Sequence, residues 1–288
     1  MDLSREDIAP WIEAAQGARL NAYTLELLGR PIVGSDLKPT AVDPFRNMAE
    51  WCRGYLEAAA DHLMLWADSV APLKFHPDVV NVYTLRPTLT LARAAMEAAA
   101  QAVWILGPDD PARRAGRYIL LATADLQEQA RAAESTESAE ALSAELEAIL
   151  TAMELAPRRF TPPRYLHMLR DAAAFFAEGL PEHASRQSWM NADRVERLWR
   201  AASGAAHGKM WPDFEFTISG DMDEEGRAYA VPDHVAMGEF VDVAASFFAA
   251  GVVLLAVRSG RYEEWDELTA AATERLLGAM TRRGDAEG

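Results

Sequence analysis

Apolar side chains recur every three or four residues along most of the chain, which is the spacing of one face of an α-helix. The first such stretch predicts a helix from about residue 5 to residue 29, and a second long helix follows it with Met48, Trp51 and Trp66 on one face. The segment 82–106 is apolar around most of its circumference, which predicts a central helix. Further amphipathic helices are predicted at residues 112–133, 139–155, 165–178, 193–207, 233–257 and 262–280.

A period-two pattern replaces the helical period in only one part of the chain. Residues 213–218 and 227–231 alternate between polar and apolar side chains, and a turn rich in glycine and acidic residues separates them. Alternation of this kind predicts two β-strands, and the short connection between them predicts a hairpin at about residues 213–232. The fold class expected is therefore all-α, a multi-helix bundle with one small β-hairpin.

The chain of 288 residues is long enough to bury a large hydrophobic core. We expect residues 1–288 to form a single helical domain, with a division into two helical halves, 1–156 and 164–288, as the alternative. The junction between the halves would be the segment 157–163, since its three prolines exclude a helix there.

Composition excludes several classes of site. Cys52 is the only cysteine, so no intrachain disulfide and no cysteine-based zinc site can form. None of the six histidines has glutamate three residues before it, and no His-Glu-x-x-His occurs, so we expect no metal. The glycine-rich nucleotide motifs are also absent, so we expect no cofactor.

The net charge of −16 argues against a general nucleic-acid-binding surface, so any contact with RNA must be local. The first seven residues are acidic and polar, unlike a secretory signal. The most apolar stretch, Val241–Val257, contains Asp242 and is short for a membrane span, which predicts a core helix. We therefore expect a cytoplasmic protein that does not enter a membrane.

The residues most typical of a functional site lie at the end of the helix predicted at 193–207. Arg200 and His207 are seven residues apart, which places them two turns apart on one helix face, and Ser203 lies between them. The residues between these three are alanine and glycine, so another helix or a backbone segment could approach this stripe closely. Gly208 follows His207 and suits the end of a helix.

The spacing of Arg200 and His207 resembles the Arg-x(4–6)-His signature of the HEPN superfamily, helical proteins that include metal-independent ribonucleases of toxin and phage-defence systems. The segment Leu198–Gly208 is also similar to a Tyr-x-x-x-Ser-x-x-x-His-Gly pattern of bacterial helical proteins near that superfamily. The resemblance covers about a dozen residues, and Ala201 stands where the strongest form of the signature has asparagine or aspartate.

The resemblance implies that Arg200 stabilises charge on the scissile phosphate of an RNA substrate and that His207 is a general acid or base. It also implies a homodimer in which two such sites face each other. The negative end of the helix dipole would favour an imidazolium at the position of His207. The structural alternative is that His207 and Ser203 satisfy buried backbone groups while Arg200 pairs with Glu196 or Glu97.

A second polar stripe follows the predicted central helix. Its members share a face at spacings of three and four residues, and they are Arg86, Thr90, Arg93, Glu97 and Gln101. In a functional interpretation Glu97 orients Arg200 or His207, while Arg93 and Arg117 bind a phosphate of the substrate. In a structural interpretation the stripe is a buried ion-pair network that fixes the register of the helices.

Aromatic residues close to the first stripe have two interpretations as well. Trp199, Trp211, Phe214 and Phe216 could line an aromatic pocket, but their helical and strand spacing favours core positions. The function expected from these residues is a HEPN-like, metal-independent ribonuclease acting as a homodimer. The alternative is a catalytically inactive helical binding or scaffold protein, with a protein partner, in which the Arg200, Ser203 and His207 stripe is structural.

Overall fold

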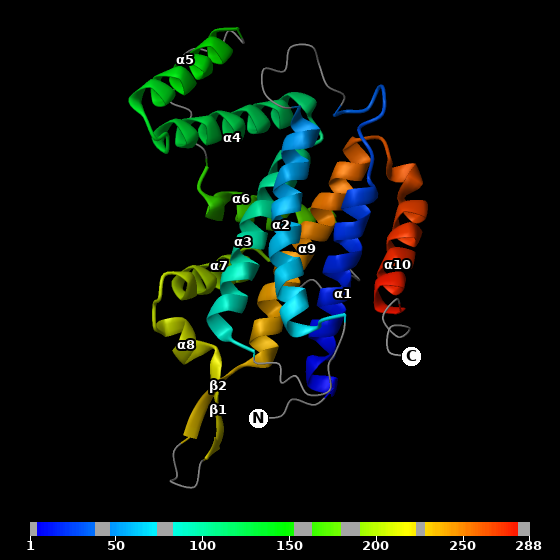
Figure 1. Ribbon diagram of the computed structural model, residues 1–288, viewed down its shortest axis with the longest axis vertical. Helices are drawn as coiled ribbons and strands as arrows, with labels where there is room; N and C mark the ends of the chain where they lie inside the picture. The colour runs from blue at the N-terminus through cyan, green and yellow to red at the C-terminus, as the bar shows by residue number, and fades with distance from the viewer. Residues whose placement is uncertain are drawn as a thin grey trace.

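The computed structural model describes residues 5–37, 47–73, 83–152, 163–179, 191–222 and 228–281 (Figure 1). Within these ranges the chain is helical apart from one two-stranded sheet, which confirms the all-α bundle with one small hairpin. The helices are α1 (Arg5–Leu27), α2 (Met48–Val70), α3 (Leu85–Leu106), α4 (Pro111–Arg131), α5 (Thr136–Ala152), α6 (Tyr165–Gly179), α7 (Ala192–Ala206), α8 (Trp211–Glu215), α9 (His234–Arg258), the 3₁₀ helix η2 (Tyr262–Glu264) and α10 (Trp265–Thr281).

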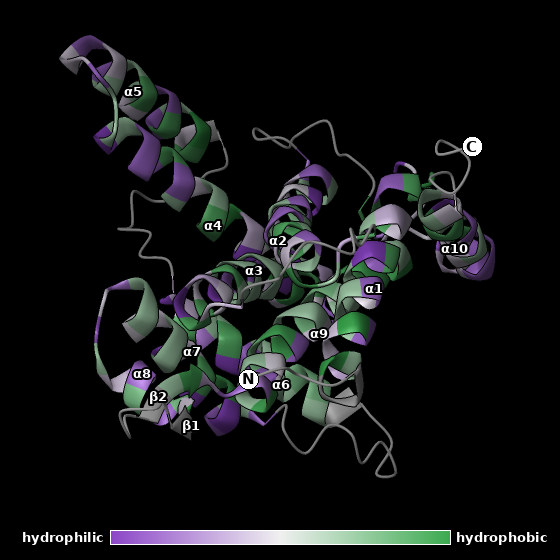
Figure 2. Cartoon of the chain, turned by 60° about the horizontal axis from the view of Figure 1, so that its bottom comes forward, coloured by the Kyte–Doolittle hydropathy of each residue, from purple (hydrophilic) through white to green (hydrophobic). Residues whose placement is uncertain are grey.

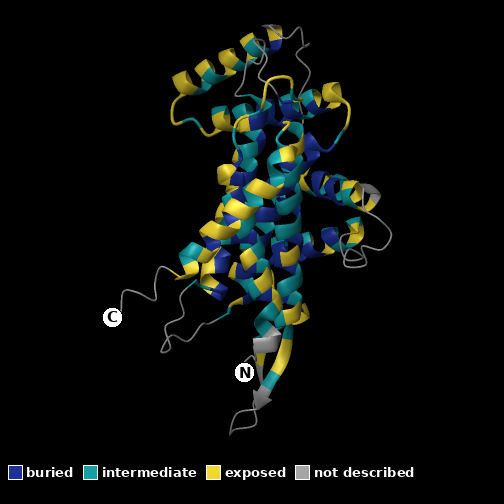
Figure 3. Cartoon of the chain, turned by 90° about the vertical axis from the view of Figure 1, so that its right-hand side faces the viewer, coloured by how far each residue is buried: buried dark blue, intermediate teal, exposed yellow. Residues whose placement is uncertain are grey.

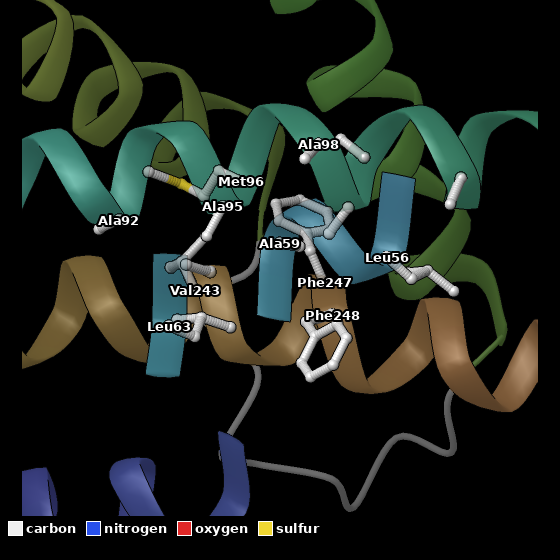
Figure 4. Packing of buried hydrophobic residues seen from close by; sticks show 14 of the residues in the cluster. Leu56, Ala59, Leu63, Ala92, Ala95, Met96, Ala98, Val243, Phe247 and Phe248 are labelled. Atoms are coloured by element: carbon white, nitrogen blue, oxygen red, sulfur yellow. The ribbon is translucent and has the colours of Figure 1, made fainter. Parts of the chain in front are cut away.

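The core forms where α2, α3 and α9 pack together, with α1 alongside α2 and α9. Figure 4 shows Leu56 and Leu63 of α2, Met96 of α3 and Phe247 of α9 along the layer where these three helices meet. All four side chains are essentially inaccessible to solvent. The core therefore draws on helices from both sides of the proline-rich segment at residues 157–163, of which only Pro163 lies within the described residues.

Helix α9 is apolar around most of its circumference, and green predominates along it in Figure 2. Among the described residues it is the one helix long and apolar enough to cross a membrane, and 56% of its most apolar window is buried inside the bundle. It packs against α1, α2 and α3, so burial against other helices accounts for its composition. This arrangement is compatible with a soluble protein.

The remaining helices surround this core. Helices α6 and α7 pack against α3 and against each other, and α10 packs against α1. Helices α4 and α5 pack on each other at the end of the bundle opposite the hairpin (Figure 1). Figure 3 shows that the centre of the bundle is buried, whereas α5 is largely exposed.

The hairpin is shorter than its sequence pattern predicts. Strand β1 (Thr217–Met222) pairs antiparallel with β2 (Ala228–Pro232), and Ile218 lies opposite Val231. Residues 213–215, predicted as strand, belong instead to α8. The cause is Pro212, which favours the first turn of a helix and whose carbonyl accepts a hydrogen bond from the backbone N–H of Phe216 at 2.9 Å.

Candidate functional site

Helix α7 carries the predicted stripe on its outer face. The side chain of Asn191 caps the helix by accepting a hydrogen bond from the backbone N–H of Arg194 at 2.7 Å. The opposite face is apolar and packs into the bundle through buried residues, which are Val195, Leu198, Ala201, Ala202 and Ala205. Because this face is fixed against the core, Arg200, Ser203 and His207 point away from it.

Arg200 is bound to a carboxylate but remains open to solvent. Its Nη2 and Nε lie 2.7 and 2.8 Å from Oε1 of Glu196, one turn earlier on α7. The same carboxylate also binds Arg170 of α6, and Arg170 contacts Asp193 at 3.1 Å. The hydrogen bonds from Arg200 and then from Arg170 hold the pKa of Glu196 below its ordinary value. The guanidinium of Arg200 is 58% exposed, and its Nη1 has no partner among the described residues.

His207 occupies the C-cap of α7 and its ring is exposed. The backbone N–H of His207 donates to the carbonyl of Ser203 at 3.1 Å, and Gly208 then ends the helix with a φ of +69°. Within the described ranges no side chain or backbone group bonds to the imidazole. Among these residues the imidazole of His207 therefore does not bind a buried backbone group, contrary to the structural alternative.

The turn after His207 is held by α3. Nη2 of Arg86 donates to the carbonyl of Lys209 at 3.1 Å and contacts Oδ2 of Asp213 at 2.5 Å. Trp211 lies over Gly204, where a Cβ would come within 2.9 Å of the indole Nε1. The small residues of the stripe therefore admit the side chains of α8, rather than another long helix.

The second stripe meets α7 through a tryptophan. Glu97 accepts hydrogen bonds from Nε of Arg93 at 2.8 Å and from Nε1 of Trp199 at 2.7 Å, and both bonds go to its Oε1. The guanidinium of Arg93 lies over the ring of Trp199 at 5.8 Å from its centroid. Glu97 and Arg93 thus form a junction between α3 and α7, and Glu97 hydrogen-bonds to Trp199 rather than to Arg200 or His207.

Arg117 belongs to a separate cluster. Its Nη1 donates to the carbonyl of Trp104 at 2.5 Å, and its guanidinium covers the indole ring of the same residue at 4.5 Å. Asp171 of α6 accepts a hydrogen bond from Nε1 of Trp104 at 3.0 Å and lies 3.5 Å from Nη2 of Arg117. Burial, followed by the nearby charge of Arg113, lowers the pKa of Arg117. Since Trp104 is two turns beyond Glu97 on α3, Arg117 and Arg93 do not share one anion site.

Two residues important to this site were not identified from the sequence. Arg170 is on α6 and reaches Glu196 from a helix with no recognisable motif, so its role depends on tertiary structure. Arg86 was placed in the second stripe, but its attachment to the turn after His207 had no signal in the sequence. Among the described residues no group of three or more histidine, cysteine or carboxylate side chains is arranged to hold a metal ion.

The aromatic residues near the stripe divide into two groups. Phe216 is buried and packs edge-on against Phe240, as its spacing predicts, and Trp199 packs between α7 and α3. Trp211 and Phe214 are exposed, so the prediction that they are core residues is wrong. The chain matches no family model, no curated protein and no solved structure, so the function has to be argued from these residues alone.

Proposed function

We propose that the protein is a HEPN-like, metal-independent ribonuclease in which Arg200 and His207 act on a phosphodiester. The observation that carries the proposal is the exposed imidazole of His207, which no described residue binds, at the end of the helix that also exposes Arg200. An exposed histidine that contributes no contact to the fold is available for proton transfer.

The guanidinium of Arg200 leaves one nitrogen open to a phosphate. Glu196 and Asp193 balance the charges of Arg200 and Arg170, so these four groups are neutral overall, but Nη1 of Arg200 has no partner among the described residues. A phosphate oxygen can then reach Nη1 of Arg200. The contact with RNA is therefore local to this nitrogen, as the net charge of −16 requires.

In the proposed reaction the ribose 2′-hydroxyl attacks phosphorus and the bond to the 5′-oxygen breaks. His207 of one copy takes the proton from the attacking hydroxyl, His207 of the second copy gives a proton to the leaving oxygen, and Arg200 stabilises the charge that develops on the phosphate. The products are a 2′,3′-cyclic phosphate and a 5′-hydroxyl. The proposal includes a cytoplasmic homodimer in which the two copies bring their His207 side chains to one substrate-binding face.

The test compares the wild type, His207→Ala and Arg200→Lys on mixed RNA substrates in the presence of a chelator. Loss of a general acid or base lowers the cleavage rate by about 10² to 10⁴. His167→Ala is the matched control, since His167 is 63% exposed on α6 and has no role in the proposal. His207→Ala is expected to melt at the wild-type temperature. Wild-type protein that leaves every RNA intact would overturn the ribonuclease.

A second candidate is a helical binding or scaffold protein without catalytic activity, in which the stripe is structural. It is favoured by the pairing of Arg200 with Glu196, which ties α7 to α6 through Arg170. In that case Arg200→Lys lowers thermal stability, and no cleavage is found in any variant.

A further inference from the structure

Helix α8 exposes two aromatic side chains, although most aromatic residues in the part of the chain that the structure describes are buried or half-buried. Phe214 is 78% exposed and Trp211 is 41% exposed. The two are three residues apart on α8, so their rings lie on one face of the helix. Exposure of large aromatic rings opposes the hydrophobic effect, so these two positions call for an explanation other than folding.

The backbone beneath these rings is held firmly. Pro212 is buried, and the indole edge of Trp211 packs against Gly204 of α7. Asp213, which lies between the two aromatic residues in sequence, is bound to Arg86 of α3. Helix α8 therefore presents Phe214 and the outer side of Trp211 in a fixed position.

Trp211 of the aromatic pair packs against the helical turn that precedes the proposed catalytic histidine. Gly204 is three residues before His207, and residues at this spacing share a face of a helix. Since Trp211 rests on Gly204, its ring lies within a turn of His207. Lys209 adds positive charge to the same turn and forms no ion pair with any described residue, whereas the charge of Arg86 is balanced by Asp213.

We propose that Phe214 and Trp211 form a stacking site for an unpaired nucleobase of a polynucleotide whose phosphate binds at Arg200 and His207. This inference rests on the proposed ribonuclease function. An aromatic ring accepts any base on its face, and the neighbouring cations bind the backbone. An apolar protein segment would also cover exposed rings, but it would leave the neighbouring cation Lys209 without an anionic partner.

Binding is measured by fluorescence anisotropy of a labelled single-stranded RNA on the full chain carrying His207→Ala, so that no cleavage occurs. Loss of one stacked base weakens binding by about 10-fold. We expect this loss for Phe214→Ala and for Phe214→Leu, and we expect Phe214→Tyr to retain the wild-type affinity. The matched control is Tyr262→Ala on η2, an aromatic residue that is 54% exposed and distant in sequence from the site.

The leucine variant separates stacking from simple apolar contact. If the Phe214→Leu variant binds RNA as tightly as the protein that retains Phe214, or if the Phe214→Ala variant loses no affinity, the stacking site is overturned. A duplex of the same sequence, which hides its base faces, is expected to bind more weakly than the single strand, and equal binding also contradicts the proposal. Because Phe214 is exposed, circular dichroism is expected to show unchanged folding in all three variants.

Measurements of cleavage and of binding test the stacking site and the proposed ribonuclease function separately. RNA cleavage that does not depend on Phe214 would leave the ribonuclease standing and overturn the stacking site. Binding that depends on Phe214, in a wild type that never cleaves RNA, would overturn the ribonuclease and leave the stacking site. A wild type that binds no polynucleotide would overturn both.

Discussion

Replacing Glu97 tests whether the second stripe holds α7 on α3. The carboxylate is 16% exposed, and a single oxygen accepts hydrogen bonds from Arg93 and from the indole of Trp199. Arg93 is itself only 21% exposed. The Glu97→Ala variant leaves a half-buried cation and a half-buried indole N–H without their acceptor, which costs more than the loss of an exposed ion pair.

The magnitude follows from the two bonds. Both bonds are accepted by the charged carboxylate, and a hydrogen bond to a charged group contributes at least about 1.5 kcal/mol, so Glu97→Ala should destabilise the fold by about 3 kcal/mol. Trp199→Phe removes only the indole donor and keeps most of the ring packing, so it should cost about 1.5 kcal/mol. In the double variant the indole bond is lost only once, so the total should fall about 1.5 kcal/mol short of the sum.

The assay is urea denaturation followed by circular dichroism, with the slope of the transition compared among variants. Glu147→Ala is the matched control, because Glu147 is exposed on α5 and has no ion pair within the described residues. Its effect should stay within about 0.5 kcal/mol. A Glu97→Ala variant as stable as this control, or full additivity with Trp199→Phe, would show that the junction between α3 and α7 does not depend on Glu97.

Two further predictions concern α7. Gly204→Ala places a Cβ 2.9 Å from the indole of Trp211. The cost of overpacking exceeds the gain in helix propensity, so the variant should be about 1 kcal/mol less stable than the wild type. An unchanged melting temperature would refute this prediction. Hydrogen bonds from Arg200 and then from Arg170 lower the pKa of Glu196 in the folded protein below its ordinary value of 4.5. These bonds therefore stabilise the fold fully above pH 4.5, and this stabilisation is lost as the pH falls through the folded-state pKa. The difference in melting temperature between the wild type and Glu196→Gln should therefore shrink in acid, and a constant difference would contradict this assignment.

Long periodic segments were predictable because burial of one face fixes the helical spacing of apolar residues. The central helix predicted at 82–106 is α3, which the structure places from Leu85 to Leu106. The hairpin was misplaced at its start, because the alternation at residues 213–218 is too short to distinguish a strand from a helical turn that begins at a proline. Local pattern thus identified the elements, and it failed where a tertiary contact, the Arg86–Asp213 pair, helps to fix the backbone.

In the candidate site, too, features of a single helix could be predicted from the sequence, whereas contacts between helices could not. The spacing of Arg200, Ser203 and His207 is a property of one helix, so their common face could be predicted from the sequence. The pairing of Glu97 with Trp199 joins residues 102 positions apart. Periodicity shows which residues share a face of one helix, but it does not show which helix that face meets. The exposure of Phe214 was missed for this reason, since its spacing equals that of a core residue.

Substitutions at Arg200 and at His207 do not test the proposed function equally well, because the two side chains differ in the contacts they make. Substituting Arg200 also breaks the connection from α7 through Glu196 to Arg170, so a loss of activity in Arg200→Lys mixes chemistry with packing. Arg170→Met breaks the same connection between α6 and α7 and removes one charge from the group, but it leaves the Arg200 guanidinium in place, so it measures packing and local charge without changing Arg200 itself. His207 has no such connection within the described residues. A cleavage defect in His207→Ala, combined with wild-type activity in Arg170→Met, would therefore assign the defect to proton transfer, whereas equal defects in both would assign it to the position and charge of α7.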